Sequence, residues 1–225
     1  MDHPAGDLST PLSVAMREGS RHEHEQAEGT EFVSDLLAGR AHPHQYAAYL
    51  ARLRDVYAAL EQAVRDHRHD PVVAQVYDES LCRLDGLDAD LDFWWPGADR
   101  SSGSPAADRY RERIDRARSA PALLVAHHYT RYLGDLSGGR MLAQAMRRGY
   151  EGLDRGGLAF YEFGAIPKPV AYKRAYRDRL DGLRLDPPLR AAMVEEVRSA
   201  FRLNHALLDE VATLGAGCVT PRCPG

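Results

Sequence analysis

The stretch "YTRYLGDLSGG", Tyr129–Gly139, places three glycines and an aspartate inside what otherwise reads as one long helix, from Pro121 to about Arg148. A glycine in a helix interior costs about 1 kcal/mol relative to alanine, so the three together cost roughly 3 kcal/mol. A typical domain is stable by only ~5–15 kcal/mol. We therefore expect these glycines to serve a purpose other than helix formation.

One side of this predicted helix carries residues that suit contact with a flat ligand. Glycine lets a backbone approach a ligand to van der Waals contact, and it lets a helix bend. The spacing Gly134-x-x-x-Gly138 is also typical of close helix–helix packing, which is the more common use. Asp135 favours a pocket, because a packing seam has no use for a carboxylate whereas a pocket with ordered water does. The residues on this side are Arg131, Gly134, Asp135, Gly138, Gly139 and Leu142.

Helical periodicity extends over nearly the whole chain. Residues 9–28, "STPLSVAMREGSRHEHEQAE", are expected to form a helix with Ser9 or Thr10 as N-cap and Pro11 at the first helical position. Residues 42–67 and 187–214 each carry an apolar stripe at helical spacing. The stripes are Tyr46, Leu50, Leu53, Tyr57, Leu60 and Val64 in the first, and Leu189, Met193, Val197, Phe201, Asn204, Leu208 and Val211 in the second.

The fold class predicted from this pattern is all-α, a single-domain irregular helical bundle, because strand-like alternation is absent. Residues 96–108 and 152–169 interrupt the helical pattern and are predicted to be loops within that domain. We expect a flexible N-terminus over residues 1–9, the helical domain over 10–214, and a disordered polar tail over 215–225.

Composition excludes several classes of protein. The 225 residues carry a formal net charge of −4, so no global basic field indicates binding to nucleic acid. No apolar run approaches the ~20 residues that a membrane span needs, and the first residues do not resemble a signal peptide. The three cysteines form neither a CxxC pair nor a disulfide framework. We expect a soluble cytoplasmic protein with no membrane anchor.

Ten histidines in a helical bundle first suggest a metal site. A carboxylate di-iron bundle needs a histidine three residues after a glutamate on two helices, and no glutamate here has one. The segment "HEHEQ", residues 22–26, also lacks the zinc signature HExxH. Ligation by a single histidine remains, and that is typical of heme.

His24 is the better candidate of the two histidines in this segment. At ~100° per residue, His22 and His24 point about 200° apart, so only one of them can face a pocket. Glu28 follows His24 by one turn and can orient its imidazole through the second nitrogen. Arg17 precedes it by two turns, where it can meet a carboxylate at the edge of a ligand. The alternative is that His24 is an ordinary surface or core histidine.

Lys173 and Arg177, in "AYKRAYRDRL", form a basic pair at i and i+4. Such a pair is most often a solvated helix face. The second interpretation is an anchor for carboxylates or phosphates.

At these same residues the sequence resembles the heme oxygenase family. "YTRYLGDLSGG" is similar to the distal-helix signature of that family, and "HEQAE", residues 24–28, is similar to its proximal-ligand segment. Shorter similar segments follow in the family's order and extend the resemblance over roughly residues 10–214. They are "YAALE" near Tyr57, "LAFY" near Phe160, the Lys173–Arg177 segment and "AFRLN" near Asn204.

The resemblance implies a fold in which heme is sandwiched between a proximal and a distal helix. It implies that His24 is the iron ligand and that Glu28 hydrogen-bonds it. The three glycines would lie against the porphyrin and the bound oxygen, and Asp135 would order a water network. The remaining residues implied are Arg17 (where the family often carries lysine), Lys173 and Arg177 near the propionates, Tyr129 on the propionate side, and Tyr57, Arg131 and Asn204 in the distal polar network.

The activity implied is oxidative opening of the heme ring to biliverdin, carbon monoxide and ferrous iron, for heme degradation and iron release. Heme b would be both the substrate and the cofactor that activates O2. Electrons would come from NAD(P)H through a ferredoxin or flavoprotein reductase, because the chain shows no flavin or nicotinamide fingerprint. The short polar tail, where membrane-bound members carry an apolar anchor, favours a soluble bacterial-type enzyme. Its Cys223-Pro224 dipeptide also occurs in some heme-responsive motifs.

Two other functions remain open from the sequence. A non-enzymatic heme carrier or sensor on the same bundle would also bind through His24, but the presence of Asp135 argues against it. A different enzyme on a related helical fold, acting on a small pyrimidine-like substrate, would need a nucleophilic cysteine in the core. Cys82 is the candidate, and it has no recognisable acid/base partner in the sequence.

Overall fold

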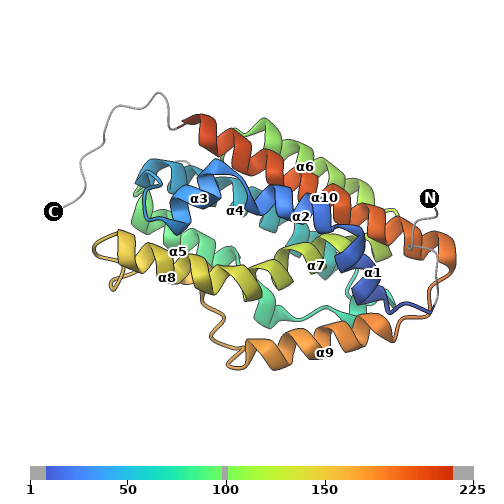
Figure 1. Ribbon diagram of the computed structural model, residues 1–225. Coiled ribbons are helices and arrows are strands. Elements are labelled where there is room, and N and C mark those ends of the chain that lie inside the picture. Colours follow the sequence, from blue (N-terminus) through green and yellow to red (C-terminus); the bar gives the residue numbers. More distant parts are fainter. Residues whose placement is uncertain (1–8, 98–100, 215–225) are drawn as a thin grey trace.

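A computed structural model describes residues 9–97 and 101–214, and every regular element within those ranges is a helix (Figure 1). This confirms the all-α prediction. A π-helix, η5 (Asp135–Gly139), joins α7 to α8, and η2 (Val73–Gln75), η3 (Glu79–Leu81), η4 (Pro121–Leu123) and η6 (Ala159–Tyr161) are short 3-10 turns. The α-helices are α1 (Leu12–Gly19), α2 (Arg21–Glu28), α3 (Glu31–Leu37), α4 (Pro43–Asp66), α5 (Leu84–Trp94), α6 (Pro105–Ala117), α7 (Leu124–Gly134), α8 (Arg140–Gly149), α9 (Pro169–Asp181) and α10 (Pro187–Thr213).

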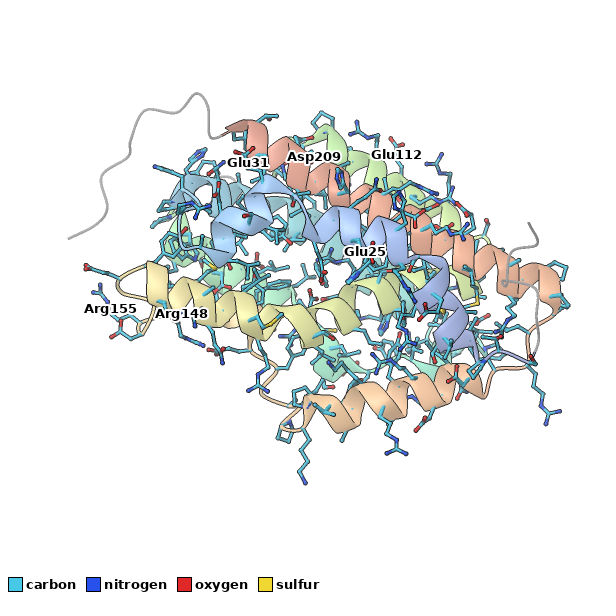
Figure 2. All side chains as sticks on the ribbon, in the orientation of Figure 1. Glu25, Glu31, Glu112, Arg148, Arg155 and Asp209 are labelled. Atoms are coloured by element: carbon cyan, nitrogen blue, oxygen red, sulfur yellow. The ribbon has the colours of Figure 1, made fainter. Side chains whose placement is uncertain are left out.

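The two long helices, α4 and α10, organise the core. The whole predicted stripe of α4 is buried, and α10 packs against α1, α2, α3, α4, α6 and α7 (Figure 1). On α10, three residues of the predicted stripe, Leu189, Phe201 and Asn204, are only partly buried. Charged side chains such as Glu112, Arg148 and Arg155 point out from the bundle (Figure 2). In the ranges that the structure describes, no helix has both the length and the hydropathy to cross a membrane.

The single helix predicted for residues 9–28 is wrong in detail. The chain forms two helices that break at Ser20, whose φ of −113° and ψ of 12° leave the helical region. At the end of α1, a Cβ on Gly19 would lie 2.6 Å from the Val194 side chain, so α1 meets α10 at van der Waals contact and the chain turns there. Pro11 is the N-cap of α1, not its first helical residue, and no side chain caps this end.

The predicted loops are partly correct. Residues 152–169 are mostly irregular, although they contain η6 and α9 begins at Pro169. The predicted loop 96–108 is wrong at its end, because α6 begins at Pro105, where the Ser104 hydroxyl accepts the Ala107 N–H at 3.1 Å and caps the helix. Apart from Ser9, the expected flexible N-terminus and the polar tail, including Cys223-Pro224, lie outside the described residues.

His128 ties α9 to α7 from the core. Its side chain is buried, its Nδ1 lies 2.8 Å from the Tyr176 hydroxyl, and the two rings stack at an interplanar angle of 9°. Burial lowers the pKa of His128 to about 3, although the charge of Asp78 opposes the shift. The imidazole is therefore neutral in the folded protein at physiological pH.

This low pKa makes stability depend on pH. Between pH 6.5 and 3 the unfolded chain binds a proton at His128 that the folded chain does not, so the free energy of unfolding falls as pH falls. The slope is ~1.4 kcal/mol per pH unit for one group. When the pH is lowered from 6.5 to 5, we expect the free energy of unfolding of His128→Gln, measured by urea titration, to fall by ~2 kcal/mol less than that of the wild type. The matched control is His69→Gln at an exposed position, and equal pH dependence in all three proteins would contradict the assignment.

Candidate functional site

The glycine-rich stretch is a π-helix between two α-helices. A single π turn inside an α-helix is rare and is frequently found at functional sites. Here it spans Asp135–Gly139, and within it the Ser137 hydroxyl donates to the Leu133 carbonyl at 2.6 Å. The sequence predicted a bend at these glycines, and the structure shows the form that the irregularity takes.

Two of the three glycines present bare backbone to open space. A Cβ on Gly134 or Gly138 would meet no atom within 4 Å, and Gly134 is exposed although Asp135 beside it is buried. Gly139 is different, because its Cβ would lie 2.8 Å from the ring of Tyr161. Gly134 and Gly138 therefore leave room for a ligand, whereas Gly139 allows Tyr161 to pack against the turn.

Asp135 points into the protein, where it meets two partners from other parts of the chain. The hydroxyl of Tyr57, on α4, donates a short hydrogen bond to Asp135 Oδ2, and Arg131 Nη2 lies 3.7 Å from Oδ1. Only 8% of Asp135 is exposed. Burial raises the pKa of its carboxyl, and Arg131 and Tyr57 limit the rise.

Arg131 extends this polar network to α10. Its Nε donates to the Tyr57 hydroxyl at 3.2 Å, and its Nη1 donates to Asn204 Oδ1. Its guanidinium carbon lies 5.3 Å from the centre of the Tyr57 ring. The structure thus brings together Tyr57, Arg131, Asp135 and Asn204, which come from α4, α7, η5 and α10 respectively.

His24 lies on α2 with its side chain about half-exposed. Its Nε2 is 3.3 Å from Glu28 Oε1, so the predicted contact between these two residues is present. In this rotamer the nitrogen that Glu28 leaves free is Nδ1. The edge of the imidazole meets the ring of Phe201, on α10, with 5.1 Å between ring centres.

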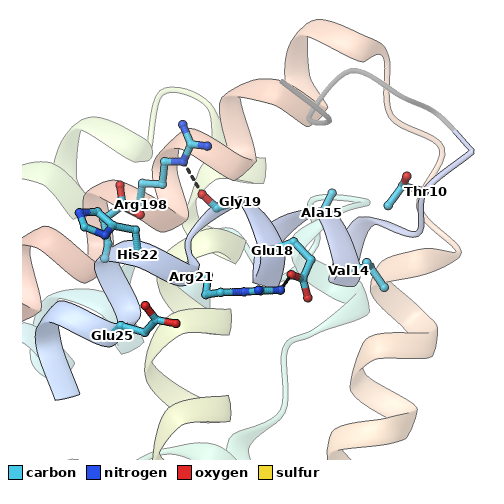
Figure 3. A pocket seen from close by; sticks show the side chains of 10 residues that line it. Thr10, Val14, Ala15, Glu18, Gly19, Arg21, His22, Glu25 and Arg198 are labelled. Carbon is cyan, nitrogen blue, oxygen red and sulfur yellow. Dashed lines mark hydrogen bonds and ion pairs between the residues drawn. The ribbon is translucent and has the colours of Figure 1, made fainter. Parts of the chain in front are cut away.

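His22 faces a different surface, as the helical geometry predicted. It is His22, and not the preferred candidate His24, that lines a cavity of about 700 Å³, together with Arg198 and residues of α1 (Figure 3). Arg198 donates to the Gly19 carbonyl at 2.5 Å on one side of this cavity (Figure 3). His128 is buried against Tyr176 and neutral, so it is not available as a ligand in this arrangement.

Helix α10 places His24 and the Asp135 network beside the same point. Phe201 contacts the His24 ring and Asn204 accepts from Arg131, and these two residues are three positions apart on α10. Residues at that spacing lie on one helix face. The half-exposed histidine and the buried polar network therefore lie next to one turn of α10, and Gly134 directly precedes Asp135 of that network in the chain.

Basic side chains gather near the turn. Lys173 Nζ donates to Ser137 Oγ at 2.8 Å, which joins α9 to the π-helix. Burial raises the pKa of Tyr129, and the positive charges of Arg177 and Arg17 oppose that rise, so both arginines lie within electrostatic reach of this phenol. Arg17 is exposed and pairs with Glu18 at 3.0 Å.

Three contacts at this site did not follow from the sequence. Phe201 was assigned to the core stripe of α10, yet it packs against His24. Ser137 lies inside the glycine motif and had no predicted role, yet it accepts a hydrogen bond from Lys173. Tyr161, of the "LAFY" segment, packs against Gly139. Their contacts depend on how α9, α10 and the loop before α9 fold against the π-helix, which local spacing does not determine.

Comparisons with known proteins match the chain nearly end to end. The family model described as heme oxygenase matches residues 10–210. Heme oxygenase 1 of Homo sapiens is 36% identical over 220 residues, covering 95% of this chain and 76% of that protein. Heme oxygenase 1 of Synechocystis sp. is 35% identical over 207 residues, covering 91% of this chain and 86% of that protein.

Solved structures agree with this result. Heme oxygenase-2 from Synechocystis sp. PCC 6803, in complex with heme and NO, superposes with a TM-score of 0.84 at 35% identity, covering 91% of this chain and 86% of that one. Heme oxygenase-1 from the same cyanobacterium, in complex with heme, gives a TM-score of 0.83 at 32% identity, with coverages of 92% and 97%. The chain belongs to the heme oxygenase family.

Proposed function

We propose that this protein binds heme b between α2 and the π-helix and opens its ring with O2, releasing biliverdin, carbon monoxide and ferrous iron. The observation that carries the proposal is the open backbone at Gly134 and Gly138, directly beside the buried Asp135 carboxylate. A flat apolar ligand can lie against such backbone while a proton-handling group stands next to it. Family membership supports the same function.

The residues of the site suit heme. His24 offers an imidazole nitrogen that Glu28 does not engage, and Glu28 limits the orientation of the ring. Arg17, Lys173 and Arg177 provide positive charge for the propionates near Tyr129. When bound, heme supplies an iron centre that takes up O2 and electrons.

The protein's own contribution on the distal side is proton handling. Asp135 accepts from the Tyr57 hydroxyl with one oxygen, and its remaining lone pairs are free to accept from a water molecule. The Arg131 charge keeps this buried carboxylate from rising further in pKa. Asp135 would therefore hold a water in place as the proton donor, and Tyr57, Arg131 and Asn204 would hold Asp135.

Electrons must reach the site from another protein. We propose NAD(P)H as their source, delivered in the cytoplasm by a ferredoxin or a flavoprotein reductase. A heme carrier or sensor would need only His24, and it would not explain the buried network of Tyr57, Arg131, Asp135 and Asn204. A cysteine-dependent enzyme is disfavoured, because burial raises the pKa of the Cys82 thiol to about 11, which opposes formation of the thiolate nucleophile.

The direct test is to add hemin and then a reductant under air. We expect a heme absorption band typical of histidine ligation, followed by conversion to biliverdin and release of carbon monoxide and iron. Biliverdin is identified by its absorption spectrum and by mass spectrometry. A stable heme complex that is not consumed under reductant and oxygen would favour a carrier or sensor, and no heme band would contradict both functions.

Replacement of His24 by alanine should abolish ring opening while the protein stays folded. Heme can still enter, because burial of its apolar faces and contacts of its propionates do not need the iron bond. The iron–histidine stretch in resonance Raman should disappear. The matched control is His22→Ala on the same helix, which should keep both the stretch and the activity; the reverse pattern would identify His22 as the ligand.

Asp135→Ala should leave heme affinity nearly unchanged and lower the rate of biliverdin formation by roughly 10²–10⁴-fold, the usual range for losing proton delivery. Asp135→Asn should keep part of the activity, because an amide still positions a water. The assay follows biliverdin together with guaiacol oxidation by hydrogen peroxide, which should increase in Asp135→Ala. Asp154→Ala removes an exposed carboxylate as control. Biliverdin formation at the wild-type rate in Asp135→Ala would refute the proton-handling role.

A further inference from the structure

The segment 157–162, which lies between α8 and α9, is held by one face of α5. Gly86, Asp90 and Trp94 are spaced four residues apart and so line one side of that helix. A Cβ on Gly86 would lie 2.9 Å from the Ala159 carbonyl oxygen, and Trp94 Nε1 donates to the Gly157 carbonyl at 2.8 Å. Three successive turns of α5 thus contact this segment.

Asp90 is the middle contact and it is fully buried, at 0% exposure. Its Oδ1 accepts the Ala159 N–H at 2.7 Å, and its Oδ2 accepts the Phe160 N–H at 2.9 Å. Burial raises the pKa of Asp90 to about 6, with a further contribution from the charge of Glu162. A carboxylate in such a place is costly unless its hydrogen bonds are made. Asp90 thus accepts hydrogen bonds from two consecutive backbone N–H groups of η6.

Arg83, just before α5, donates hydrogen bonds to backbone carbonyl groups of the same segment. Its Nη1 donates to the Phe160 carbonyl at 3.3 Å and to the Glu162 carbonyl at 2.7 Å, and its guanidinium carbon lies 3.8 Å from the centre of the Phe163 ring. The backbone of η6 is therefore fixed through its N–H groups by Asp90 and through its C=O groups by Arg83.

The side chains of η6 pack against Tyr57 and against the end of the π-helix that carries Asp135. The ring of Phe160 packs edge-on against the ring of Tyr57, with 5.6 Å between centres. The ring of Tyr161 fills the space beside Gly139, at the end of the turn that carries Asp135. Because packed interiors transmit displacements, a shift of η6 moves the Tyr57 ring and the π-helix relative to each other.

We propose that Asp90 is a positioning residue for ring opening: by fixing η6, it sets the hydrogen bond between the Tyr57 hydroxyl and the Asp135 carboxylate. Asp90 does not itself touch the ligand side of the turn, so it acts through Phe160 and Tyr161. The effect of Asp90 on the rate of ring opening rests on the proposed function. Its effect on the hydrogen bond between Tyr57 and Asp135 does not. A misplacement of a few tenths of an ångström is enough to weaken a hydrogen bond and proton transfer through it.

The test is Asp90→Asn, which keeps the shape of the side chain. Its amide has one acceptor oxygen and turns an NH2 group toward the second backbone N–H, so one of the two hydrogen bonds is lost. In the heme-free protein, the Asp135 carboxyl pKa measured by 13C NMR should rise, because Tyr57 donates less well. Removal of the Asp90 charge alone would act in the opposite direction. With heme, kcat should fall about tenfold, while the heme concentration at half-saturation should change less than twofold.

Two further variants complete the experiment. Asp85→Asn makes the same change at an exposed position of α5 and should alter neither readout. Gly86→Ala pushes the Ala159 carbonyl without changing charge, and should raise the Asp135 pKa and lower kcat in the same direction; it carries the test if Asp90→Asn does not fold. A folded Asp90→Asn protein with wild-type Asp135 pKa and kcat would overturn the proposal. Failure of the wild type to form biliverdin would instead contradict the proposed function, since the heme-free titration stands on its own.

Discussion

The hydrogen bond from the Tyr57 hydroxyl to the buried Asp135 carboxylate is the interaction on which the rest of the site depends. A carboxylate in the protein interior is expensive unless it is hydrogen-bonded and has a counter-charge nearby. Tyr57 supplies the hydrogen bond and Arg131 supplies the counter-charge. Asn204 accepts a hydrogen bond from the other terminal nitrogen of Arg131. The four side chains come from four helices, so the bundle must assemble before the carboxylate is tolerated, and the site exists only in the complete fold.

The glycines of the turn solve a second problem, which is access. If Gly134 or Gly138 carried a side chain, it would fill the open space beside Asp135, and a flat ligand would be kept away from the backbone. The cost in helix stability is roughly 2 kcal/mol for these two positions. Gly139 has another purpose, since Tyr161 packs where its side chain would be. Under the proposed function, the first two glycines of this motif give the ligand access, and the last allows internal packing.

The fold class and the glycine-rich stretch could be read from the sequence because their signals are local, whereas residues such as Tyr57 and Asn204 came only from the family resemblance. The apolar stripe of α4 and the glycine cluster each depend on residues within a few turns, and all of the predicted α4 stripe is buried. The break at Ser20 was missed because the packing of α1 on Val194, a residue distant in sequence, decides it. The start of α6 at Pro105 has a local signal, the cap of Ser104 followed by proline, which the loop-like composition of residues 96–108 obscured. Likewise the contact of His24 with Phe201 joins residues 177 positions apart, and no local pattern encodes it.

The two sides of the site differ in how firmly the protein holds them. The distal side is fixed by buried hydrogen bonds from α4, α7 and α10, and by η6 behind it. Helix α2 has eight residues, of which only Ala27 is buried, so its order depends on contacts with α10 such as that between His24 and Phe201. Helices this short are marginal without tertiary contacts. A ligand that bonds to His24 and lies against Gly134 would add contacts mainly to the weaker side, and by mass action would stabilise α2 more than the rest of the bundle.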